Sequence, residues 1–126
     1  MHVETIYLKP DSSFSTQIAE WATSIGVPVE EYDVKMEEHS AEGLLLINEN
    51  QDIEKELYEL HTLFDKKHMP TQKIDVNGTL QVAVSNFEMW LRTFKCKKVL
   101  IMGSDKLVEN ENLQRFLSRI QKVSIS

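Results

Sequence analysis

The sequence predicts a single α/β domain over residues 1–126, a three-layer α/β/α sandwich around a mostly parallel sheet of about five strands. Two short runs, residues 44–47 and 99–102, are apolar at every position, and each ends in small polar residues. A strand without polar alternation has to be covered on both faces, as in the centre of a parallel sheet wrapped by helices. Segments with helical periodicity follow both runs, and this alternation is typical of the α/β class. We expect residues 44–47 and 99–101 to be almost fully buried.

The first strand is expected at residues 3–8, followed by the first helix. Asp11 or Ser12 supplies the N-cap, and apolar residues recur on one helical face until Gly26 ends the helix. A second strand is expected at residues 27–34. Acidic residues alternate with apolar ones there, and such charge suits the edge of a sheet.

The connection to the third strand is short. Residues 35–43 are fewer than the dozen or more that a parallel crossover usually takes, so we expect only a helical turn there. The third strand at residues 44–47 leads into a helix that Asn50 or Asp52 would cap. This helix ends in the cationic segment 66–68, which suits the negative end of a helix dipole.

The second half of the chain continues the alternation. A half-polar fourth strand is expected at residues 71–76, then a long helix ending near Phe94, a fifth strand at 99–102 and a last helix. The flavodoxin-like or Rossmann-like class of sheet is expected, with the flavodoxin-like order 2-1-3-4-5 as the first choice. The fully apolar fifth strand fits an edge poorly, so an order with the fourth strand outermost remains an alternative.

Composition and charge narrow the functional classes. No apolar run approaches the roughly 20 residues that span a bilayer, and the N-terminus lacks the pattern of a secretory signal. The single cysteine, Cys96, fits a reducing compartment, so we expect a cytoplasmic protein with no membrane partner. The net charge of −6 combines 14 acidic and 3 basic residues in 1–60 with 6 acidic and 11 basic residues in 61–126. A basic patch on one face could bind nucleic acid, but a pI near 5.2 argues against that partner.

The predicted ligand crevice lies outside the carboxyl ends of the strands. The weak ligand-binding candidates are the polar residues at those ends: Ser12, Ser13, Asn48, Asn77 and Ser104. Segment 8–16 resembles the hydroxyl-rich phosphate loop of flavodoxins, but it lacks glycine, and Pro10, Asp11 and Phe14 stand in it. We therefore assign no family. Asp11 would repel a free anion, so a neutral polar or metal-bridged ligand is favoured.

No metal site or catalytic group can be assigned from the sequence. No two of the four histidines have the i, i+4 spacing of a helical metal site, and Cys96 stands alone, so no metal is expected. No Walker A loop, Rossmann glycine fingerprint or nucleophile elbow is present. The cofactor, the catalytic residues and whether the protein is an enzyme stay open.

We favour a small module that acts by association with itself or a protein partner. In the long third helix, one apolar stripe would dock on the sheet: Leu80, Ala83, Val84, Phe87, Leu91 and Phe94. Val82 and Met89 fall on roughly the opposite side and Trp90 flanks the stripe, so these three residues predict a homodimer interface. The alternative is an enzyme, or a protein that binds a nucleotide or another small ligand, using the rim at the carboxyl ends of the strands.

Overall fold

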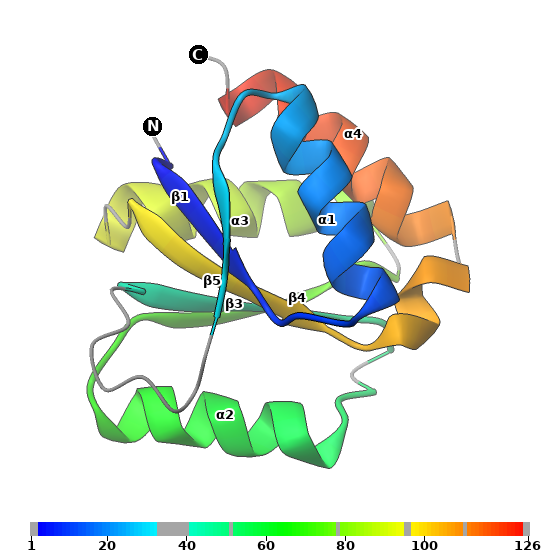
Figure 1. The fold of residues 1–126 in the computed structure, drawn as a ribbon. Helices are drawn as coiled ribbons and strands as arrows, with labels where there is room; N and C mark the ends of the chain where they lie inside the picture. The colour runs from blue at the N-terminus through cyan, green and yellow to red at the C-terminus, as the bar shows by residue number, and fades with distance from the viewer. Residues whose placement is uncertain are drawn as a thin grey trace.

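The computed structural model describes residues 3–32, 41–50, 52–77, 79–94, 97–109 and 111–124. Within them five strands form one parallel sheet: β1 (Thr5–Leu8), β2 (Val29–Glu31), β3 (Gly43–Asn48), β4 (Thr71–Asp75) and β5 (Lys98–Gly103). The helices are α1 (Ser13–Ser24), α2 (Lys55–Lys66), α3 (Leu80–Phe94) and α4 (Glu111–Ser124), with a short 3₁₀ helix, η1 (Asp105–Glu109), before the last (Figure 1). The predicted α/β class with a parallel sheet is confirmed. No helix among these residues is both long and apolar enough to cross a membrane.

The strand order is β2-β1-β5-β3-β4, which corrects the expected order 2-1-3-4-5. β5 lies between β1 and β3, and β4 is the outermost strand, as the alternative had it. The physical reason is burial. β5 is apolar from Val99 to Met102 and needs cover on both faces, whereas β4 carries the exposed Lys73 and tolerates an edge.

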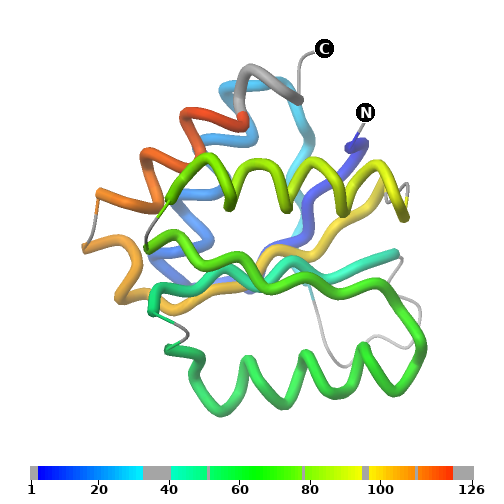
Figure 2. Tube along the Cα trace, turned by 180° about the vertical axis from the view of Figure 1, so that it is seen from behind, coloured from blue at the N-terminus to red at the C-terminus, as the bar shows by residue number. Residues whose placement is uncertain are grey.

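The two faces of the sheet are covered unequally. α1, α3 and α4 lie on one face, and α2 is the only helix described on the other (Figures 1 and 2). Side chains of β3 alternate between these layers, with Leu45 and Ile47 toward the three helices and Leu44 and Leu46 toward α2. Residues 44–47 and 99–101 are all buried, as predicted, and Met102 is buried as well.

Some element boundaries differ from the sequence-based expectation. β2 is shorter than residues 27–34, and most of the expected turn at 35–43 lies outside the described residues. α2 begins at Lys55 with Glu54 as its cap residue, not at Asn50 or Asp52. Asp52 instead forms an isolated bridge with Glu49, and Asn50 has a positive φ of 58°, which a helix start excludes.

The exposed side of α3 agrees with the prediction at two residues and differs at two others. Val82 and Met89 are 56% and 61% exposed, as the helical spacing predicts. Trp90 is only 3% exposed because it packs in the core under α3, so it is not available to a partner, whereas Phe94, expected in the docked stripe, is exposed. Apolar side chains that are exposed singly are ordinary on protein surfaces. The homodimer interface stays a prediction, which now rests on Val82 and Met89.

Candidate functional site

The strand order places a crevice between β5 and β3. The helices that follow β1 and β5 lie on one face of the sheet, whereas α2, which follows β3, lies on the other (Figure 1). Neighbouring parallel strands whose connections leave in opposite directions create a crevice at their carboxyl ends, where α/β proteins bind ligands. Asn48 ends β3 and Ser104 follows β5, so these two predicted site residues flank that crevice. Both are buried.

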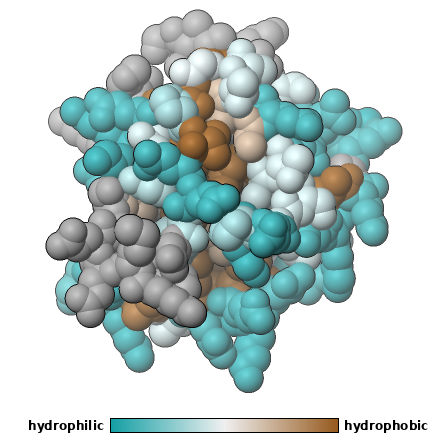
Figure 3. Space-filling view, in the orientation of Figure 1, coloured by the Kyte–Doolittle hydropathy of each residue, from teal (hydrophilic) through white to brown (hydrophobic). Residues whose placement is uncertain are grey.

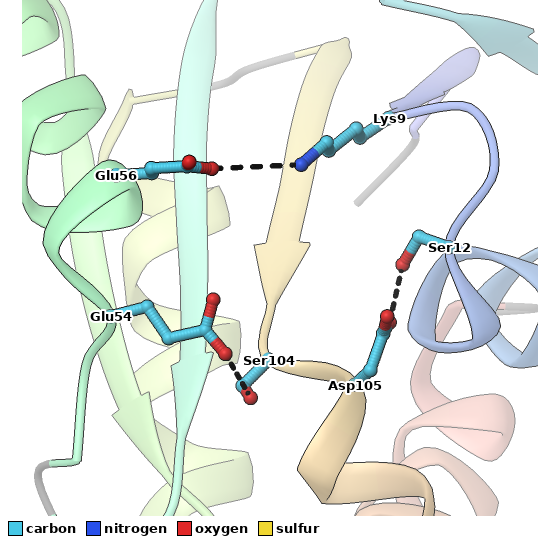
Figure 4. A network of polar contacts seen from close by, with 6 residues as sticks. All are labelled: Lys9, Ser12, Glu54, Glu56, Ser104 and Asp105. Carbon is cyan, nitrogen blue, oxygen red and sulfur yellow. Dashed lines mark hydrogen bonds and ion pairs between the residues drawn. The ribbon is translucent and has the colours of Figure 1, made fainter.

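Ser104 links the two sides of the crevice. Its hydroxyl donates a 2.7 Å hydrogen bond to Glu54 Oε1 at the start of α2 and accepts a 3.2 Å bond from the Lys106 amide (Figure 4). A hollow of about 300 Å³ lies beside this contact, and several of its lining residues are charged: Glu49, Asp52, Lys106 and Glu109. Glu54 could not be identified from the sequence, because its contact with Ser104 depends on β5 lying next to β3.

Asp105 occupies the N-terminus of α1. Its Oδ1 accepts hydrogen bonds from the Ser12 hydroxyl at 2.7 Å and from the Phe14 amide at 3.0 Å (Figure 4). The Ser12 bond, then the Phe14 amide, and to a smaller extent the charge of Lys9 lower the pKa of Asp105, although partial burial acts against them. A helix N-terminus is where α/β proteins commonly bind phosphate. Here the chain's own carboxylate fills that position.

We expect Asp105→Ala to reduce the free energy of unfolding by about 1 kcal/mol, the usual cost of losing a helix cap. Because the folded pKa is depressed below the ordinary 3.8, this stabilisation is complete above that value. It should disappear as the pH falls through the folded pKa. Urea unfolding at pH 7 and at successively lower pH measures the difference. Asp52→Ala, at another exposed aspartate of the same edge, should stay within about 0.5 kcal/mol at every pH. A loss in Asp105→Ala that persists unchanged in acid would contradict the role of the charge.

A third polar contact joins the ends of β3 and β4. Asp75 Oδ1 accepts from the Asn50 amide at 3.0 Å and from the Asn77 amide at 2.9 Å, and the Asn77 side chain donates to Asn50 Oδ1. These contacts fix the loop after β3 onto the edge strand. Asn77, predicted to touch a ligand, is therefore engaged in a structural contact. Ser13, the remaining predicted residue, is exposed and lines an open groove between α1 and α4 instead of the crevice.

The largest apolar hollow at this edge, which we call the α2 pocket, is about 680 Å³. It lies between α2 and the carboxyl ends of β1, β2 and β5. Its apolar lining is Tyr32, Leu57, Leu60, Leu63 and Met102. Its charged lining is Lys9, Glu31, Glu56 and Glu59, with Lys9 Nζ 3.8 Å from Glu56 Oε2 across the opening (Figure 4). Figure 3 shows small areas of apolar surface above the α2 layer, between hydrophilic side chains.

The structure brings no metal centre together among the residues it describes. They contain no group of three or more His, Cys, Asp or Glu placed to hold a metal ion. Partial burial, followed by the charge of Lys73, lowers the pKa of His61, while Asp65 opposes the shift. His2, His39 and Cys96 lie outside the described residues.

Comparison with known proteins supports the fold. No protein-family model matches the chain, and no curated protein matches its sequence. A solved structure from Syntrophus aciditrophicus SB, described as a molybdenum carrier protein, is similar with a TM-score of 0.74. The match covers 98% of this chain and 96% of that chain at 10% sequence identity. At that identity the likeness shows the fold alone, a Rossmann-like parallel α/β sandwich.

Proposed function

We propose that the protein binds a small organic molecule in the α2 pocket. The observation that carries the proposal is a hollow of about 680 Å³, with mainly aliphatic and aromatic walls, at the carboxyl ends of three parallel strands. Ligand sites in proteins commonly measure about 300–1,000 Å³ and combine apolar walls with a few polar groups. The Lys9–Glu56 pair and the carboxylates of Glu31 and Glu59 supply those polar groups.

The position of α2 accounts for the pocket. α2 packs over β3 and β4, at one side of the sheet, so its flank faces the ends of β5, β1 and β2. Glu56, Glu59, Leu60 and Leu63 follow the spacing i, i+3, i+4 and i+7, which places them on one stripe of the helix. That stripe forms one wall, and Tyr32 and Met102 contribute to the opposite wall.

The structural neighbour supports ligand binding as a use of this fold, because it is described as a molybdenum carrier. Our proposal takes only the binding of a small ligand from that description. The N-terminus of α1, a natural place for an oxyanion, already holds Asp105, and the lining of the α2 pocket carries three carboxylates against one ammonium group. The geometry thus favours an organic ligand over a metal oxyanion.

Ligand-observed NMR with a library of small organic fragments tests the proposal. We expect fragments that bind the wild-type protein to lose binding in Leu63→Arg, because the longer side chain would enter the pocket. Leu63 is 44% exposed, so this change should leave the fold intact. Val82→Arg is the matched control, since Val82 is an exposed helical position on α3, which packs on the other face of the sheet. A library with no binders, or binders indifferent to Leu63→Arg, would refute the proposal.

A further inference from the structure

We infer that the α2 pocket selects a ligand with an apolar body and a cationic amine. This inference rests on the proposed function and adds the chemical class of the ligand. The pocket walls suit an apolar body: Leu57, Leu60 and Met102 line it, and Leu57 and Met102 belong to the core on the α2 side of the sheet. The charged residues around these walls determine which polar group the ligand should carry.

The pocket lining has an excess of negative charge. Glu56 is neutralised by Lys9 at 3.8 Å, and both of these side chains extend into solvent. Glu31, at the end of β2, and Glu59, one turn further along α2, form no ion pair with any residue that the structure describes. An ammonium group placed between Glu31 and Glu59 would neutralise their charge, as Lys9 neutralises that of Glu56. An anionic group would instead face two carboxylates without a cation.

Two other places at this edge, formed by residues that the structure describes, are also unsuitable for an anion. The amide of Phe14, at the N-terminus of α1, already donates to Asp105, and the Ser12 hydroxyl donates to the same carboxylate. The neighbouring hollow beside Ser104 is lined by Glu49, Asp52 and Glu109 together with one lysine, Lys106. The charge of both hollows therefore disfavours phosphate or carboxylate ligands and favours amines.

Three probes with the same ring and different head groups test the inference: phenethylamine, phenethyl alcohol and 3-phenylpropanoate. Titrations monitored by NMR at pH 7 and low salt should give the amine an affinity about threefold to tenfold above the alcohol, as for one or two exposed ion pairs. The carboxylate should bind weakest. The amine advantage should shrink in about 0.5 M NaCl, because salt screens exposed charges.

The variant Glu31→Gln/Glu59→Gln should remove the advantage of the amine and leave alcohol binding unchanged. Glu30→Gln/Asp65→Asn is the control, because it makes the same charge change on the same strand and the same helix, at positions that do not line the pocket. Equal binding of all three probes, or a preference for the carboxylate, would overturn the charge selection while leaving the pocket in place. If none of the probes binds, the inference and the proposed function fail together.

Discussion

Replacing Leu46 with alanine should lower the free energy of unfolding by about 2–5 kcal/mol, the cost of a lost aliphatic side chain plus the cavity it leaves. Leu46 is 0% exposed and lies between Met102 of β5 and Lys73 of β4 in the sheet, under α2. The neighbouring residues in β4 and β5 are held by the hydrogen bonds of the sheet, so they cannot move far into the cavity. Urea denaturation followed by circular dichroism measures the change.

Leu63→Ala is the matched control for this prediction. It removes the same atoms from a leucine that is 44% exposed and packs at the edge of α2, so it should cost much less. Equal losses at the two positions would mean that the layer between α2 and the sheet is not a close-packed core.

The second large effect is expected at Gly103, the last residue of β5. A Cβ atom there would lie 2.7 Å from two atoms of the Phe14 ring and 3.0 Å from Leu107 Cδ1. Phe14 is buried in the core on the side of α1, so the ring has little room to retreat. Gly103→Ala should therefore cost about 1–3 kcal/mol, as overpacking of a core does.

A double-mutant cycle separates this steric cause from a general weakness of the strand. Phe14→Leu shortens the side chain that the new methyl group meets, so the double variant should lose clearly less stability than the sum of the two single changes. Gly26→Ala provides a contrast: nothing lies within 4 Å of a Cβ there, and its cost should come only from a positive φ of 78° and not depend on Phe14. Additive losses in the Gly103 and Phe14 cycle would contradict the close contact.

The fold class could be predicted because a strand that is buried on both faces is apolar at every position, which is visible in the local sequence. The unbroken apolar runs of β3 and β5 required cover on both faces, whatever the order of the strands. The order of the strands could be predicted only from a weaker signal, the half-polar pattern of β4. That signal disagreed with the flavodoxin-like order 2-1-3-4-5, which was the first choice. Lys73 in β4 was that signal, and it indicated the edge correctly.

The start of α2 and the inner face of α3 show where local patterns fail. Asn50 looks like a cap residue, but its backbone amide binds Asp75, a residue 25 positions away, and the helix starts later. Phe94 fits the apolar stripe of α3 by spacing, yet it occupies the last turn and is exposed, while Trp90 takes the buried position. Tertiary contacts decide whether such residues are buried, and these contacts cannot be inferred from helical spacing.

The sequence predicted a ligand site at the carboxyl edge of the sheet, but none of the five predicted residues lines the α2 pocket. The carboxyl edge follows from any parallel sheet, so Ser12, Asn48 and Ser104 were correctly placed at that edge. Glu31, Glu56, Tyr32 and Met102 were missed because they come together only when β1 and β2 lie beside β5 and α2 covers the same face.

The most direct test of ligand binding in the α2 pocket uses methionine methyl groups as reporters. Met102 is 7% exposed and lines the pocket, whereas Met89 is 61% exposed on α3 at the other face of the sheet. In protein labelled with ¹³C at the methionine methyl groups, titration with phenethylamine should shift the Met102 signal progressively to saturation and leave the Met89 signal in place. A Met102 signal that stays unmoved at millimolar probe, or equal shifts at Met102 and Met89, would contradict a binding site at the carboxyl ends of these strands.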